Sequence, residues 1–114
     1  MEVKNFEVEV LAASHEHPIV VDFWAPWCGP CRILTPVLEK LEREANGQWR
    51  LAKVNSDENS ELALAWQVRG IPAVKMIHNG EMIAEFVGAL PEVQVRRWLE
   101  THLPSAAKAA LAAA

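Results

Sequence analysis

The sequence has few cysteines, and they are not spread along the chain. Of its 114 residues only two are cysteines, Cys28 and Cys31. Small secreted domains that are held together by disulfides carry more cysteines at dispersed positions. A structural zinc site needs four ligands, commonly two such pairs, and the four histidines supply no second pair at that spacing. We therefore expect neither a disulfide-stapled scaffold nor a metal site.

Basic clusters and long apolar runs are also missing. The 11 Lys and Arg residues are scattered, whereas nucleic-acid-binding proteins gather them in a patch or stripe. No apolar run approaches the roughly 20 residues that cross a bilayer. The N-terminal residues are charged and lead into no hydrophobic signal core. We expect no nucleic-acid partner, no membrane association and a cytoplasmic location.

What is present is the composition of an ordinary globular domain. Hydrophobic residues make up 51%, charged residues 23%, and the net charge is −4, as in globular domains generally. The length suffices for one domain with its own core. We assign residues 1–104 to this domain and residues 105–114, which are rich in alanine, to a helix-prone tail. No large exposed apolar stripe is evident, so we expect a monomer.

Hydrophobic periodicity predicts alternating strands and helices. The continuous apolar run over 19–24 is typical of a strand buried on both faces, and Asn79-Gly80 is a strong hairpin signal. The predicted helices cover 5–14, 28–45, 60–68 (with Asn59 or Ser60 as N-cap) and 91–103, and the predicted strands cover 19–24, 49–55, 74–78 and 81–87. An early parallel pair with a right-handed crossover and a late hairpin together predict an α/β fold with a mixed sheet. Any strand before residue 5 would be very short.

The two longer predicted helices are amphipathic. Pro36 should kink the first of them, and Asn46-Gly47 should end it. The residues predicted to face the core are Ile33, Leu34, Val37, Leu38 and Leu41 in the first helix, and Val93, Val95, Trp98 and Leu99 in the last.

The chemistry of the chain is concentrated in Cys28-Gly29-Pro30-Cys31. Thiols at i and i+3 on the first turn of a helix share a face and can come close enough to bond. A helix N-terminus favours the thiolate form of Cys28, which is the reactive form, and Pro30 suits a first turn. We expect Cys28 to be exposed and Cys31 to be shielded, an arrangement suited to disulfide exchange. The alternative is a pair of ordinary structural cysteines.

Four segments stand in order along the chain: Val21 to Cys31, Ala52-Lys53-Val54-Asn55, Gly70-Ile71-Pro72 and Phe86-Val87-Gly88-Ala89. Together they resemble the active-site regions of the thioredoxin family. A lone Cys-x-x-Cys is a weak signal outside a βαβ context, but the match here runs without gaps from about residue 19 to residue 103. The resemblance implies a thioredoxin fold over residues 1–104, with a central mixed sheet of four to five strands flanked by four helices.

The resemblance also implies roles for residues around the cysteines. Pro72 should follow a cis peptide bond and lie against the pair, where the backbone of Ile71 can hold an extended substrate chain as an added strand. A trans proline at a strand entry is the alternative. The residues implied to bind substrate are Trp27, Gly29, Pro30, Ile71, Pro72, Val87, Gly88 and Ala89, of which Trp27, Ile71, Val87, Gly88 and Ala89 would form an apolar rim.

Asp22 is a charged residue inside an apolar strand. Burial disfavours an ionised carboxylate and should raise its pKa. In the family this group accepts the proton of the resolving cysteine, Cys31, and Lys53 resembles the lysine beside it. The alternatives are a structural buried acid at Asp22 and a solvated strand residue at Lys53.

The implied activity is thiol–disulfide exchange. Cys28 would attack disulfides of other proteins, Cys31 would resolve the mixed disulfide, and a flavin- and NADPH-dependent thioredoxin reductase would restore the dithiol. No cofactor beyond the Cys28–Cys31 pair is implied.

A second interpretation starts from Leu103-Pro104 and the alanine-rich tail. They resemble the junction in bacterial proteins that fuse a thioredoxin domain to tetratricopeptide repeats, and such proteins act as chaperones or co-chaperonins that bind clients.

Overall fold

The computed structural model describes residues 1–104; the predicted tail, 105–114, lies outside the described residues. A four-stranded sheet lies at the centre, in the order β2-β1-β3-β4. Its strands are β1 (Ile19–Trp24), β2 (Arg50–Asn55), β3 (Ala73–His78) and β4 (Glu81–Val87). β1 pairs with β2 in parallel and with β3 antiparallel, and β3 pairs antiparallel with β4. The sheet is therefore mixed, as the sequence predicts.

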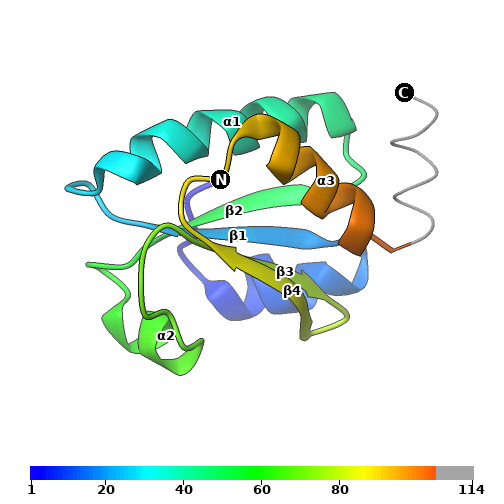
Figure 1. The fold of residues 1–114 in the computed structure, drawn as a ribbon. Coiled ribbons are helices and arrows are strands. Elements are labelled where there is room, and N and C mark those ends of the chain that lie inside the picture. Colours follow the sequence, from blue (N-terminus) through cyan, green and yellow to red (C-terminus); the bar gives the residue numbers. More distant parts are fainter. Residues whose placement is uncertain (105–114) are drawn as a thin grey trace.

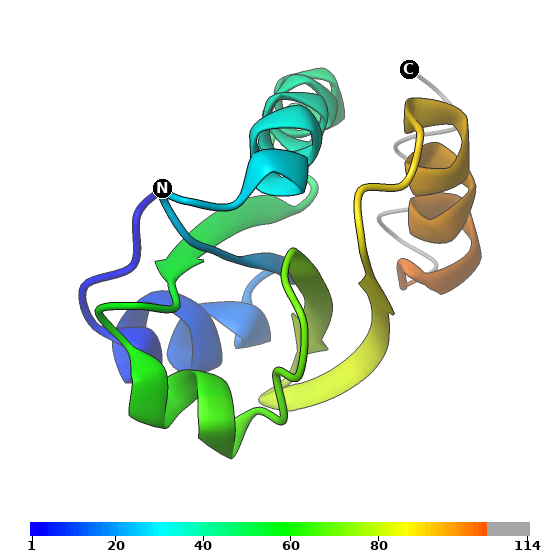
Figure 2. The ribbon, with the colours of Figure 1, turned by 60° about the vertical axis from the view of Figure 1, so that its left-hand side comes forward.

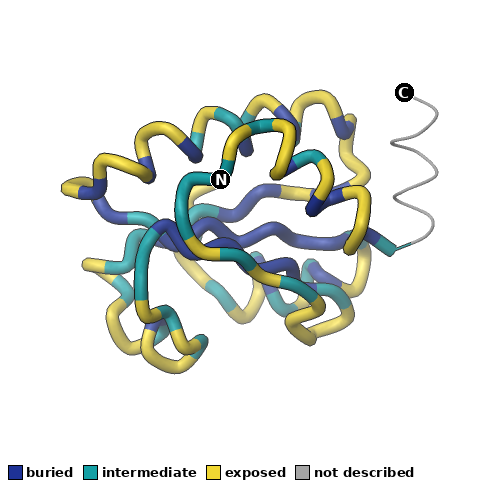
Figure 3. The backbone as a smooth tube through the Cα atoms, viewed as in Figure 1, coloured by how far each residue is buried: buried dark blue, intermediate teal, exposed yellow. Residues whose placement is uncertain are grey.

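Helices cover both faces of this sheet (Figure 1 and Figure 2). On one face lie α1 (Gly29–Ala45) and α3 (Glu92–His102), and on the other lie η1 (Glu7–Ala12), η2 (Ala13–His15) and α2 (Ser60–Ala65). Each layer encloses its own apolar cluster against the sheet. The buried backbone of β1 and β3 runs between more exposed helices (Figure 3). Within residues 1–104, every helix is too short or too polar to cross a lipid bilayer.

Local sequence signals explain several element ends. Asn46 takes the left-handed conformation (φ 51°) at the C-terminus of α1, and Asn79 (φ 53°) with Gly80 (φ 79°) makes the β3–β4 turn. Both positive-φ sites match the residue types that tolerate this conformation. α1 continues through Pro36. Asn59 occupies the N-cap of α2, but its side chain caps nothing there and instead donates to the carbonyl of Asn55 at 2.9 Å.

Two residues predicted to lie in the core are on the surface. Ile33 and Val93 are 68% and 65% exposed. The sheet covers only one side of each helix, which carries residues four and seven positions apart in α1 and three and four positions apart in α3. That side buries Leu34, Leu38 and Leu41 of α1 and Val95, Trp98 and Leu99 of α3. Val37 is partly buried beside the first set.

The first residues of the chain lie beside β2. Glu2 and Lys53 form an isolated parallel bridge. The backbone N–H of Lys53 donates to the carbonyl of Met1 at 2.7 Å, and the N–H of Val3 donates to the carbonyl of Lys53 at 2.8 Å. This bridge is shorter than a strand, as expected from the few residues available, and it brings Glu2 next to the carboxyl half of β2.

Candidate active site

Cys28 and Cys31 lie where β1 passes into α1. Cys28 is the N-cap of α1, and Gly29 and Pro30 begin its first turn. The two sulfurs form a disulfide, with the Cα atoms 5.3 Å apart. The backbone N–H of Cys31 points at Cys28 Sγ at 3.2 Å. A thiolate at Cys28 would meet the same N–H and the positive end of the helix dipole, which stabilise negative charge.

The disulfide is less accessible than the sequence suggests. Cys28 is 3% exposed and Cys31 is 2% exposed, so the expectation of an exposed Cys28 is wrong for this bonded form. Ala25 is buried with the pair, and Trp24 and Ile71 pack against it. These neighbours come from two separate segments, whose convergence could not be seen in the spacing of the cysteines.

Two loops complete the site: one precedes β3 and the other follows β4, at the ends of these strands opposite their shared turn. The peptide bond between Ile71 and Pro72 is cis. The carbonyl of Pro72, which is buried, accepts a hydrogen bond from the N–H of Gly88 at 2.8 Å. Gly88 has a φ of 95°, a conformation that suits glycine. The loops at Pro72 and Gly88 are thus joined, and Ile71 lies against the cysteines.

Some of the predicted rim residues are open to solvent. Trp27 is 69% exposed and Val87 is 61% exposed. The indole N–H of Trp27 donates to both carboxylate oxygens of Asp57, at 3.1 and 3.2 Å. No sequence pattern predicts this partner, because 30 positions separate the two residues. Ala89, predicted for the same rim, is half-buried and packs against the cluster beneath α1 and α3.

Asp22 lies in the middle of β1 and has no exposed surface. Burial raises the pKa of its carboxyl to about 6, while the hydrogen bond from Thr35 and the charge of Lys53 act in the opposite direction. The hydroxyl of Thr35 donates to Asp22 Oδ2 at 2.7 Å. Asp22 Oδ1 has no hydrogen-bond partner within residues 1–104. The prediction of a raised pKa for Asp22 is confirmed in direction and cause.

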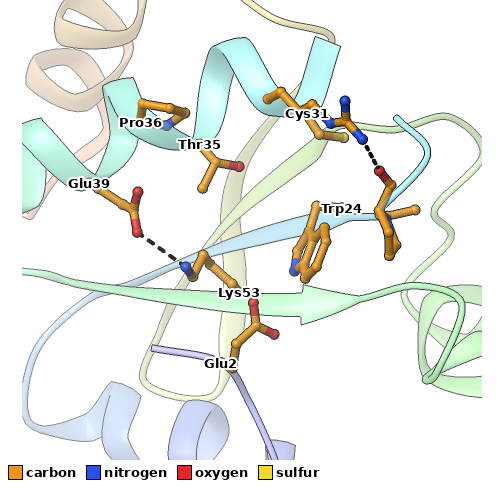
Figure 4. A pocket seen from close by; sticks show the side chains of 10 residues that line it. Glu2, Trp24, Cys31, Thr35, Pro36, Glu39 and Lys53 are labelled. Carbon is orange, nitrogen blue, oxygen red and sulfur yellow. Dashed lines mark hydrogen bonds and ion pairs between the residues drawn. The ribbon is translucent and has the colours of Figure 1, made fainter. Parts of the chain in front are cut away.

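A cavity of about 320 Å³ opens beside Cys31 (Figure 4). Cys31, Thr35 and Lys53 line it, together with the acidic residues Glu2 and Glu39. Lys53 is the register partner of Asp22 in the parallel pair, and its Nζ lies 3.1 Å from Glu39 Oε2. Lys53 is therefore near the buried carboxylate as expected, but its ion pair is with Glu39. Thr35, Glu39 and Glu2 were not predicted here, because only the folded chain brings them together.

The sequence of residues 1–101 matches the family model described as Thioredoxin. The chain belongs to the thioredoxin family. It is 37% identical over 103 residues to a thioredoxin of Haemophilus influenzae, covering 90% of this chain and 96% of the relative. It is 40% identical over 99 residues to thioredoxin 1 of a Nostoc species, covering 87% and 91%. Over 102 residues it is 38% identical to the chloroplastic thioredoxin M5 of Oryza sativa, covering 90% of this chain and 58% of that protein.

Family membership and the site agree. The resemblance and the thioredoxin fold predicted from the sequence are confirmed, with a four-stranded sheet. The chain is a thioredoxin-type disulfide oxidoreductase, and Cys28–Cys31 is its redox-active disulfide.

Proposed function

We propose that this thioredoxin-family chain reduces the disulfides of other proteins in the cytoplasm. In this proposal a flavin- and NADPH-dependent thioredoxin reductase returns its disulfide to the dithiol. The observation that carries the proposal is the position of Cys28 at the N-terminus of α1, beside the loops of Ile71-Pro72 and Val87-Gly88. The cytoplasm suits this direction of exchange, because its thiols are kept reduced.

The first step is attack by the Cys28 thiolate. Its electron pair forms a bond to one sulfur of the substrate disulfide, and the other substrate sulfur leaves as a thiolate. Trp27 and Val87 offer exposed apolar contact for the substrate chain. The backbone of Ile71 would hold that chain in an extended form, while the exposed Gly29 and Pro30 leave room above Cys28. Gly88 and Ala89 would extend the same surface.

The second step is resolution by Cys31. The Cys31 thiol gives its proton to the Asp22 carboxylate, and the resulting thiolate attacks Cys28 Sγ. The bond between Cys28 and the substrate sulfur breaks, so the substrate leaves with both its sulfurs reduced and two electrons have passed. In this scheme Lys53 lies beside Asp22 and favours its ionised form until the proton arrives.

Serine variants of the two cysteines test the proposal. We expect Cys28→Ser to lose all turnover on a disulfide-containing protein, because no attacking thiol remains. We expect Cys31→Ser to accumulate a covalent complex with the substrate, visible on a non-reducing gel and released by dithiothreitol. A Cys28→Ser variant that still reduces substrate would contradict the proposed roles.

The direction of exchange needs its own measurement. Equilibration of the wild-type protein with glutathione buffers gives its reduction potential. A reducing potential, near that of family members that donate electrons at about −270 mV, would support the role as a reductase. A potential near the roughly −120 mV of strongly oxidising periplasmic relatives would overturn it.

A further inference from the structure

We propose that the hydroxyl of Thr35 is a positioning residue for the proton transfer from Cys31 to Asp22. The proposal rests on the second step of the proposed function, in which Asp22 receives that proton. It adds a residue on α1 that the resemblance to the family did not assign.

The geometry places Thr35 between the cavity and the buried carboxylate. Thr35 is one helical turn after Cys31 on α1, and residues four apart lie on the same face of a helix. Both residues line the cavity, with Lys53 across from them (Figure 4). Asp22 itself is fully buried, and its only side-chain hydrogen bond within residues 1–104 comes from Thr35 at 2.7 Å.

Because of this single bond, only one of the two carboxylate oxygens of Asp22 accepts a hydrogen bond from a side chain. A threonine hydroxyl has one hydrogen to donate, and here it is directed at Asp22 Oδ2. Asp22 Oδ1 is buried and free of protein donors in the part of the chain that the structure describes. Thr35 therefore fixes the orientation of the carboxylate and leaves Oδ1 as the oxygen that can take the proton of Cys31.

The bond also favours the ionised carboxylate. A hydrogen bond to a charged form stabilises that form, and the Thr35 hydroxyl works against burial in setting the pKa of Asp22. The other charged groups that face Asp22 are Lys53 on β2, Glu39 on α1 and Glu2 beside β2; Lys53 lowers its pKa and the two glutamates raise it. Changing Thr35 alone leaves these three charges in place.

The decisive variant is Thr35→Val, which removes the hydroxyl and keeps the branched shape. We expect the ¹³C titration of the Asp22 carboxyl in the oxidised protein to move upward by about one pH unit or more, because hydrogen bonds to charged groups are strong. From a pKa of about 6, a one-unit shift should lower the limiting rate of substrate-thiol release in single-turnover experiments by about twofold at pH 7 and by close to tenfold below pH 6, and the midpoint of its pH profile should rise by the same one unit.

Three further variants separate positioning from general damage. Thr35→Ser keeps the hydroxyl and should restore both the titration and the pH profile. In an Asp22→Asn background, Thr35→Val should have no further effect on the rate. Thr101→Val is a matched control, because it removes an exposed threonine hydroxyl bonded to the Arg97 carbonyl at 2.8 Å on α3.

The outcomes are distinct. A Thr35→Val protein whose Asp22 titrates with the wild-type midpoint, or a Thr35→Ser protein shifted as far as Thr35→Val, would overturn the inference. Should Thr35→Val fail to fold, Thr35→Ala serves in the same comparison with Thr35→Ser. A wild-type protein that reduces no disulfide substrate would refute the proposed function, whereas the carboxyl titration would still report on the Thr35 bond.

Discussion

Asp22 is an ionisable group with no solvent-exposed surface. The strand around it is apolar, and its register partners are Lys53 on β2 and Val74 on β3. Holding a charge at such a position opposes folding. The ionised residue therefore works against stability, a cost that the proposed proton transfer from Cys31 would explain.

The pH dependence of folding should reveal this conflict. Burial raises the pKa of Asp22 to about 6 from an ordinary 3.8. Between these values the folded protein holds a proton that the unfolded chain has released, so the free energy of unfolding falls as the pH rises. The Asp22→Asn side chain does not ionise, so its free energy of unfolding does not fall in this way. The variant should be more stable than the wild type at pH 7, by up to about 3 kcal/mol.

Urea unfolding of both proteins at pH 4 and pH 7 measures this difference. At pH 4 Asp22 is protonated in the folded state, and the two proteins should be close in stability. A variant that is equally stabilised at both pH values would show that the gain comes from packing and not from ionisation. The same variant should resolve mixed disulfides slowly, because asparagine cannot take a proton.

At this scale the sequence revealed some site residues and not others. Asp22 was recognisable because a carboxylate stands alone in an apolar strand, and Cys28 and Cys31 because of their spacing. Thr35 and Glu39 lie on a helix whose polar positions look like an ordinary solvated face. Asp57, the partner of Trp27, follows β2 far along the chain. Only the packing of α1 and β2 against β1 brings these residues to the site.

Between elements, Ser14 joins the N-terminal helical segment to the β3–β4 hairpin. It lies in η2 and is fully buried. Its Oγ donates to the Leu11 carbonyl at 2.6 Å and accepts from the Gly80 N–H at 2.8 Å, while its own carbonyl accepts from the Asn79 N–H at 3.0 Å. One side chain thus satisfies the nearby Leu11 carbonyl and the N–H of Gly80, which lies 66 positions further along the chain than Ser14.

Ser14→Ala should destabilise the fold by about 1–3 kcal/mol, because it leaves Gly80 N–H and the Leu11 carbonyl without their partner. The midpoint of urea unfolding measures the loss. Thr101→Val again provides the comparison, since its hydroxyl is exposed and should matter by less than about 0.5 kcal/mol. Equal losses of stability in the two variants would mean that the buried hydroxyl of Ser14 contributes no more to folding than an exposed one.

The sequence predicted the type of each element more reliably than which face of a helix would be buried. The apolar run of β1 and the Asn79-Gly80 turn depend on local chemistry, and both were predicted. The orientation of Ile33 and Val93 depends on where the sheet lies relative to each helix. Helical periodicity gives the angle between two side chains but not the side on which a neighbour will pack.

The whole molecule is a sheet with a separate apolar cluster on each face, and its two edges differ. At the β2 edge, the backbone of Met1 and Val3 already bonds Lys53. At the β4 edge, Glu81 and Glu85 are exposed, and charged residues on an edge strand discourage pairing with another chain. Glu85 is paired with Lys75 at 2.8 Å, so the like charge that a second copy would meet along β4 is that of Glu81.

We therefore expect a monomer in solution, with a mass near 12.7 kDa. Light scattering at several protein concentrations, in both the dithiol and the disulfide form, measures this mass. A mass that doubles as concentration rises would show that the charged edge or the exposed rim does associate. Comparison of the two redox forms would then tell whether that association involves the site.

The five tryptophans differ widely in their surroundings. Trp49 has no exposed surface and Trp98 is 9% exposed, whereas Trp27 is 69% exposed and adjoins the redox pair. Collisional quenchers such as iodide or acrylamide would therefore reach Trp27 far more readily than Trp49 or Trp98. A bound substrate chain would shield it, so loss of quenching would give an intrinsic optical signal of docking without any added label.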